Sequence, residues 1–135
     1  IAFTNASVAL VHGMSRPVGA YFHVPHGLSN AALLGVVMEF SLMGNPDRYA
    51  RIAGAMGIDT TGLLPMEAAE EGTLLVKKLI ADLEIPSLEK LGVEKKKLDK
   101  VVEQMAKDAI ASGSPGNNPR IATPQEIVGL YYEAF

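Results

Sequence analysis

Residues 11–30 read VHGMSRPVGAYFHVPHGLSN and contain all three histidines of the chain, at positions 12, 23 and 26. His12 ends one apolar run and His26 opens another. Between them lies a predicted connector that holds Pro17, Gly19 and Pro25. The pattern therefore predicts a helical hairpin that brings two imidazoles together. Two imidazoles make half of a divalent metal site, which needs at least three protein ligands.

The composition is that of a single folded domain. The chain has 135 residues, 48% of them hydrophobic, which is enough for a core. Its formal net charge is -3, whereas nucleic-acid binding depends on clustered positive charge. The lysine run at 95–97 falls opposite an apolar stripe, so we interpret it as a solvated face and expect no nucleic-acid partner. The chain has no cysteine, which excludes disulfides and thiolate metal sites and suits a reducing cytoplasm.

Charged residues avoid the first third of the chain. Of the 12 basic and 15 acidic residues, only Arg16 and Glu39 precede position 45. Residues 2–14 and 27–43 are apolar or small on every side, which predicts two helices that are covered all round. A membrane hairpin is the rival interpretation, but the second run contains polar residues and its uninterrupted apolar part is too short to span a bilayer. We therefore predict a buried helical pair and no membrane partner.

Helix signals continue beyond this pair. Asn45 and Pro46 are an N-cap and a first-turn proline, and the short helix that they open ends at Gly57. Pro65 opens a longer helix that stops before Pro86. Its expected buried stripe comprises Leu75, Val76, Leu79, Ile80 and Leu83.

The last third of the chain predicts two more helices. One has a continuous apolar face from Leu98 to Ile110 and ends at Gly113. The stretch SPGNNPR at 114–120 blocks regular structure, and the capping box at 123–126 opens the final helix. No alternating strand pattern, internal repeat or linker is found. We therefore predict an all-α fold, a helical bundle.

Besides His12 and His26, two nearby side chains, His23 and Arg16, are candidates for chemistry. A lone histidine such as His12 is more often a core residue than a ligand, but His26 begins a helix, where the helix dipole favours a neutral imidazole with a free lone pair. His23, in the connector, is a candidate third ligand. Arg16 is expected either to cap the carbonyls that end the first helix or to hold an anionic group. It cannot act as a general base, because it does not release its proton.

Three stretches resemble the C-terminal helical domain of the iron-containing (group III) alcohol dehydrogenases. They are NASVALVHGMSRPVGAYFHVPHGLSNAALL at 5–34, NPR at 118–120 and EIVGLYYEAF at 126–135. The likeness covers the whole chain and is strongest to the lactaldehyde and propanediol type. It implies the C-terminal part of the dehydroquinate synthase-like fold shared by this family.

The resemblance also implies a site and a reaction. In the family one aspartate and three histidines hold the metal, and two of those histidines match His12 and His26. Phe3 is placed beside the substrate pocket. The implied activity is hydride transfer between NAD(P) and a short alcohol or aldehyde, with Fe²⁺ or Zn²⁺ as the metal, in a cytoplasmic homo-oligomer.

The chain departs from the family pattern at two points. The family's aspartate and first histidine have no counterpart, and no NAD(P)-binding α/β domain precedes the helices, so residues 1–135 are expected to be an inactive C-terminal fragment. Many members also have a relay histidine where this chain has Arg16. Two alternatives stay open: a fragment of a zinc-dependent, glycerol-dehydrogenase-like enzyme, and a non-catalytic helical remnant or interaction module.

Overall fold

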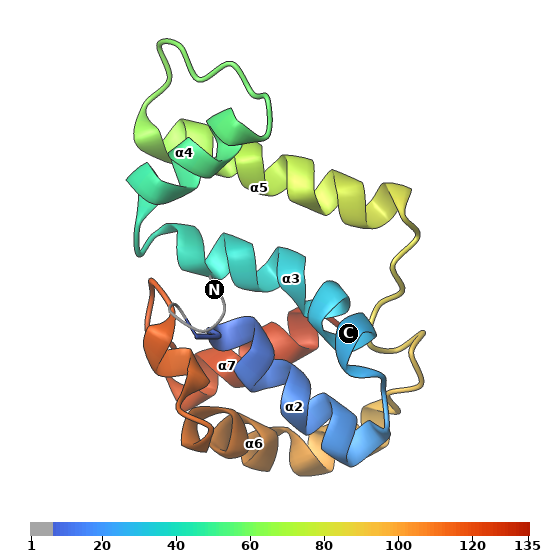
Figure 1. The fold of residues 1–135 in the computed structure, drawn as a ribbon. Coiled ribbons are helices and arrows are strands. Elements are labelled where there is room, and N and C mark those ends of the chain that lie inside the picture. Colours follow the sequence, from blue (N-terminus) through green and yellow to red (C-terminus); the bar gives the residue numbers. More distant parts are fainter. Residues whose placement is uncertain (1–6) are drawn as a thin grey trace.

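Residues 7–135 are described by a computed structural model, and within this range every regular element is a helix. The predicted all-α fold is therefore confirmed for this part of the chain (Figure 1). Within the same range, no helix is both long and apolar enough to cross a membrane. The elements are α2 (Leu10–Phe22), α3 (His26–Leu42), α4 (Pro46–Ala55), α5 (Pro65–Asp82), α6 (Lys95–Ala111), the short 3-10 helix η1 (Ser114–Asn117) and α7 (Pro124–Glu133).

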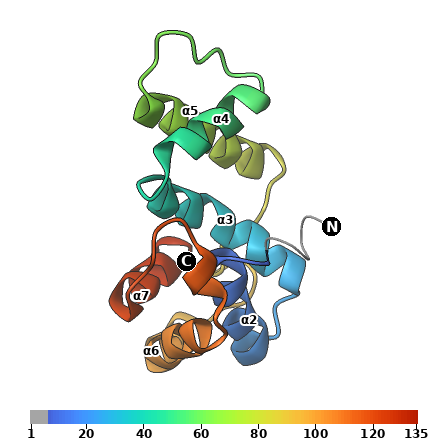
Figure 2. The same cartoon turned by 60° about the vertical axis from the view of Figure 1, so that its left-hand side comes forward.

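Helix α3 runs through the middle of the molecule and joins two groups of helices. On one side α4 and α5 pack on each other, and α5 also packs on α3. On the other side lie α2, α6 and α7, with η1 against α2 and α6. Figure 2 shows the same division, with the α4 and α5 pair above α3 and the remaining helices below it. This central place explains why α3 is rich in apolar and small residues and has no continuous polar face.

One hydrophobic core fills the space between α2, α3, α6 and α7. Its largest fully buried side chains come from all four helices and from the loop before α6. They include Leu10, Met14, Leu33, Leu88, Leu98, Met105, Ile127 and Tyr131. The core therefore holds α2, which carries His12, against three other helices.

Helix starts follow the predicted capping signals. The Asn45 side chain accepts a 3.2 Å hydrogen bond from the backbone N–H of Arg48, and Pro46 begins α4. At α7, Thr123 and Glu126 form a reciprocal capping box, and Pro124 between them is the first residue of the helix. These caps satisfy backbone N–H groups that have no partner within their own helix.

The first helix continues further than predicted. Helix α2 passes through Pro17 and Gly19 and ends at Phe22, so these two residues do not belong to a connector. A proline inside a helix removes one backbone hydrogen bond and costs about 3 kcal/mol. Here Pro17 and its neighbour Val18 are buried, and their packing offsets that cost. The connector is reduced to residues 23–25. The helix predicted over residues 2–14 was also wrong at residues 7–9, which are not helical, because α2 begins at Leu10; its part before residue 7 lies outside the described residues.

The buried stripe predicted for α5 is wrong in its second half. The helix buries small residues near its start, whereas Leu79 is 51% exposed and Leu83 is 63% exposed. At Gly72, an added Cβ would lie 2.8 Å from the Cβ of Ala53 in α4. Helix α4 therefore packs tightly on the first half of α5 and, with only 10 residues, is too short to cover the rest.

Candidate metal centre

The connector after α2 turns back along that helix and places the start of α3 beside it. His23 has a left-handed backbone, with φ of 59°, and ends α2. The carbonyl of Val24 then lies close to Gly19, where an added Cβ would be 3.5 Å from its oxygen. Because residues 23–25 retrace part of α2, the first residue of α3, His26, reaches the turns near the start of α2.

His12 and His26 lie next to each other, as the hairpin prediction requires. Their ring centroids are 5.4 Å apart and the ring planes are tilted by 57°. Two imidazoles that share one metal, with metal–nitrogen distances of about 2.0 to 2.1 Å, have centroids about 5 Å apart. The separation of the two rings therefore fits two ligands of one divalent ion.

The side chains of Ser15 and Asn30 lie within hydrogen-bond distance of the His26 ring nitrogens. The hydroxyl oxygen of Ser15 lies 3.2 Å from Nδ1, and the amide nitrogen of Asn30 lies 3.1 Å from Nε2. The Ser15 hydroxyl also donates a 3.2 Å hydrogen bond to the backbone carbonyl of His12. Ser15 thus links the two histidines, one through its ring and the other through its backbone.

Neither Ser15 nor Asn30 was predicted as a site residue. The available signal was spacing on a helix, because Ser15 is three residues after His12 and Asn30 is four residues after His26. That spacing indicates which residues share a face of one helix. It does not indicate that Ser15, in α2, contacts His26 in α3.

The local environment favours a neutral His12. Burial is the main cause that lowers the pKa of His12, and the nearby His26 and Arg16 lower it further. A neutral imidazole keeps the lone pair that a metal ligand needs. The donor chemistry of His12 therefore fits a metal at neutral pH.

Arg16 does not cap the end of α2, because the helix continues beyond it. Its guanidinium donates a 3.2 Å hydrogen bond through Nη1 to the hydroxyl of Ser114 in η1. The residue is otherwise exposed. Arg16 is thus held by Ser114 and lies one helical turn after His12. A guanidinium has five N–H donors, so Arg16 can also donate to an anionic partner.

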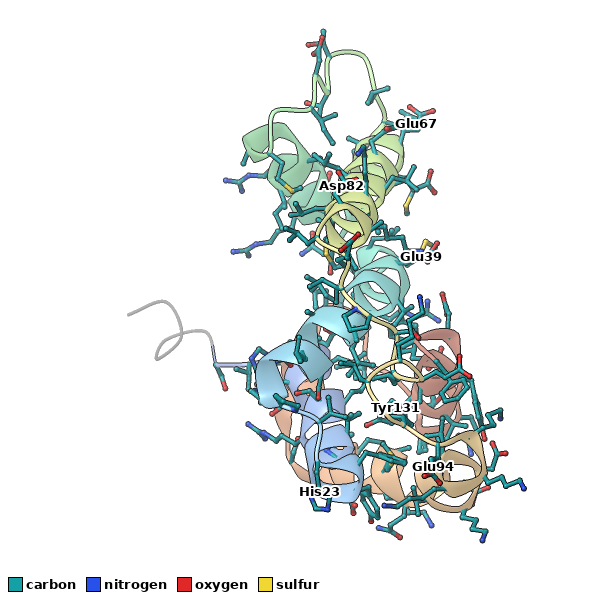
Figure 3. All side chains as sticks on the ribbon, turned by 90° about the vertical axis from the view of Figure 1, so that its right-hand side faces the viewer. His23, Glu39, Glu67, Asp82, Glu94 and Tyr131 are labelled. Carbon is teal, nitrogen blue, oxygen red and sulfur yellow. The ribbon has the colours of Figure 1, made fainter. Side chains whose placement is uncertain are left out.

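His23 does not join the other two histidines. It is exposed at the end of α2, and Figure 3 shows it at the lower end of the molecule. Within residues 7–135, no group of three or more His, Asp or Glu side chains is arranged to hold a metal. The two adjacent imidazoles fit a metal as partial ligands only. Phe3, the predicted pocket residue, lies outside the described residues.

Comparisons with known proteins identify the family to which this all-helical domain belongs. The model for the C-terminal part of the Fe-containing alcohol dehydrogenase family covers residues 1–135, and the chain belongs to this family. The resemblance noted in the sequence is thereby confirmed.

Individual relatives agree with this assignment. The chain is 37% identical to 1,3-propanediol dehydrogenase of Klebsiella pneumoniae and 36% identical to lactaldehyde reductase of Escherichia coli K12, over 100% of its own length. It spans only 34% and 35% of those two proteins, about a third of each. A solved structure of 1,3-propanediol oxidoreductase superposes with a TM-score of 0.91 at 37% identity, covering 99% of this chain and 34% of that one.

Proposed function

We propose that residues 1–135 are the C-terminal helical domain of a metal-dependent, NAD(P)-linked alcohol dehydrogenase, with His12 and His26 as two of the metal ligands. The observation that carries the proposal is the 5.4 Å separation of the two rings in a chain of this family. The metal is Fe²⁺ or Zn²⁺, because imidazole and carboxylate ligands suit both ions. A bound ion would supply Lewis-acid chemistry at the alcohol or aldehyde oxygen, while the nicotinamide exchanges hydride with the carbon.

Arg16 is proposed to bind a negatively charged part of the substrate or its polarised oxygen. The hydrogen bond to Ser114 fixes one side of the guanidinium, so the remaining N–H groups are positioned with little loss of side-chain entropy. A guanidinium does not release its proton, so Arg16 does not relay one. Phe3 is proposed to shape the substrate pocket, which accepts short alcohols and aldehydes.

The remaining ligands and the cofactor site are proposed to lie in another part of the enzyme. Relatives are about three times as long as this chain, since it covers 34% of the propanediol dehydrogenase. An NAD(P)-binding α/β domain, an aspartate and one more histidine are expected from that additional length. Residues 1–135 alone are therefore expected to be inactive, and the complete enzyme is proposed to be a cytoplasmic homo-oligomer.

The test uses the complete enzyme that contains this domain. It is treated with a chelator, reloaded with Fe²⁺ or Zn²⁺, and assayed with NAD and NADP on a panel of short diols and aldehydes. We expect chelation to abolish activity, reloading to restore it, and His12→Ala or His26→Ala to prevent the restoration. His23→Ala, the matched control, should leave activity unchanged. Full activity of the chelated enzyme would contradict the proposal and favour a helical module that binds no metal.

A further inference from the structure

Ser15 stands out among the buried serines because it contacts a histidine ring. Ser15 and Ser29 are both fully buried, at 0% exposure, and each donates a 3.2 Å hydrogen bond to a backbone carbonyl of its own helix or helix start. Only the Ser15 oxygen also lies 3.2 Å from Nδ1 of His26. The backbone role is therefore common to both serines, and the ring contact is particular to Ser15.

The direction of each hydrogen bond follows from the donors that are available. The Ser15 hydroxyl has one proton, which goes to the carbonyl of His12, so its oxygen accepts from the His26 ring. At the other ring nitrogen, the amide N–H of Asn30 can only donate, so Nε2 accepts at 3.1 Å. Both bonds agree on one tautomer, in which Nδ1 carries the proton and Nε2 carries the lone pair.

We infer that Ser15 is a positioning residue that fixes His26 as the Nδ1–H tautomer and so presents Nε2 to the metal. The inference deepens the proposed function and rests on it for the metal. Metal-binding histidines commonly donate their second ring N–H to a fixed acceptor, which sets both the tautomer and the ring orientation. Here the acceptor is the hydroxyl oxygen of Ser15, from the neighbouring helix α2.

Asn30 keeps the Nε2 lone pair satisfied when no metal is bound. The amide oxygen of Asn30 is buried and has no hydrogen-bond partner within the described residues. If His26 changed to the Nε2–H tautomer, rotation of the Asn30 amide would give that N–H an acceptor. Ser15 favours the Nδ1–H form, because its oxygen accepts that proton. Without Ser15, the alternative tautomer becomes the better bonded one, and Nε2 would carry a proton in place of its lone pair.

The first experiment measures the tautomer in the metal-free chain. The ¹⁵N chemical shifts of the His26 ring, recorded above the titration range of the histidines, report which nitrogen carries the proton. We expect Nδ1–H in the wild type, in Ser29→Ala and in Ser15→Thr, which keeps a hydroxyl. In Ser15→Ala we expect the Nε2–H form to become the major one. A wild-type ring with Nε2–H, or a Ser15→Ala ring identical to the wild type, would overturn the inference.

The second experiment measures Co²⁺ affinity in the same four proteins. Loss of an outer partner of a metal-binding histidine lowers metal affinity about 10-fold or more, and we expect this loss for Ser15→Ala only. Equal Co²⁺ affinities of Ser15→Ala and Ser29→Ala would overturn the inference that Ser15 positions His26 for the metal. The tautomer experiment needs no metal, so it tests this inference independently of the proposed function. A failure of the proposed function would instead appear as absence of Co²⁺ binding in the wild type.

Discussion

The phenolic hydroxyl of Tyr131 donates a 2.7 Å hydrogen bond to the backbone carbonyl of Met14. Tyr131 is fully buried in α7, and Met14 lies in α2, two residues after His12. Figure 3 shows Tyr131 inside the lower group of helices. Burial raises the pKa of Tyr131, so the hydroxyl keeps its proton as a donor. This bond joins the last helix of the chain to the helix that carries the candidate ligand.

The variant Tyr131→Phe tests how much this hydrogen bond contributes to the free energy of unfolding. Loss of one buried hydrogen bond should lower the free energy of unfolding by about 1 to 2 kcal/mol, measured by urea denaturation. Tyr132→Phe is the control, because the Tyr132 hydroxyl bonds Asp99 at the surface. We expect the control to change stability by less than about 0.5 kcal/mol. Equal losses of unfolding free energy in the two variants would show that the buried Tyr131 hydrogen bond stabilises the fold no more than the surface bond of Tyr132 does.

Gly13→Ala tests the close approach of α2 and η1. A Cβ at Gly13 would lie 2.9 Å from two side-chain carbons of Pro115, whose ring cannot turn away. We expect a loss of about 1 to 3 kcal/mol in the free energy of unfolding. The control is Gly129→Ala in α7, where an added Cβ meets nothing within 4 Å and the better helix propensity should stabilise by up to about 1 kcal/mol. Stabilisation by both substitutions would contradict the packing described here.

Glu126 should make stability depend on pH. Hydrogen bonds from the backbone and side chain of Thr123, and then the Arg120 guanidinium, lower the pKa of Glu126. Because the folded-state pKa lies below the unfolded value, the stabilisation is present above the unfolded pKa and is lost as pH falls through the folded pKa.

Glu126→Gln is the corresponding variant. Its free energy of unfolding should be lower than that of the wild type at neutral pH, and the gap should close as the pH becomes acidic. Glu133→Gln removes the same charge from the other end of α7 and serves as the control. A gap for Glu126→Gln that stays constant across the pH range would exclude the ionised capping box as its source.

Residues 1–135 alone should self-associate through α5. Leu74 is 58% exposed and Leu79 is 51% exposed on this helix, and exposed apolar surface of this kind promotes association. In sedimentation experiments we expect the double variant Leu74→Gln and Leu79→Gln to shift the chain toward monomer, and Lys78→Gln on the same helix to have no such effect. A wild-type chain that stays monomeric at high concentration would refute this prediction.

The sequence predicted the features that depend on local signals. The caps at Asn45 and Thr123 were identified correctly, because each cap is made by neighbouring residues in the chain. The adjacency of His12 and His26 was also predicted, but from a longer connector than the structure has, because α2 continues to Phe22 and only residues 23–25 join it to α3.

The features that depend on tertiary contacts were not predictable in this way. Pro17 indicated a helix end, yet packing in the core carries α2 through it. The apolar stripe of α5 indicated burial, but α4 is too short to cover it. The link from Ser15 to His26 exists only because the connector turns back along α2, which no local pattern encodes.

The central claim, that His12 and His26 bind one metal, is tested most directly by titrating Co²⁺ into the chain of residues 1–135 and following its absorption spectrum. Four proteins are compared: wild type, His12→Ala, His26→Ala and His23→Ala. We predict weak binding in the wild type and in His23→Ala, and affinities lower by about 10-fold or more in the other two variants. Equal affinity in all four proteins would contradict the claim and leave His12 and His26 as structural residues.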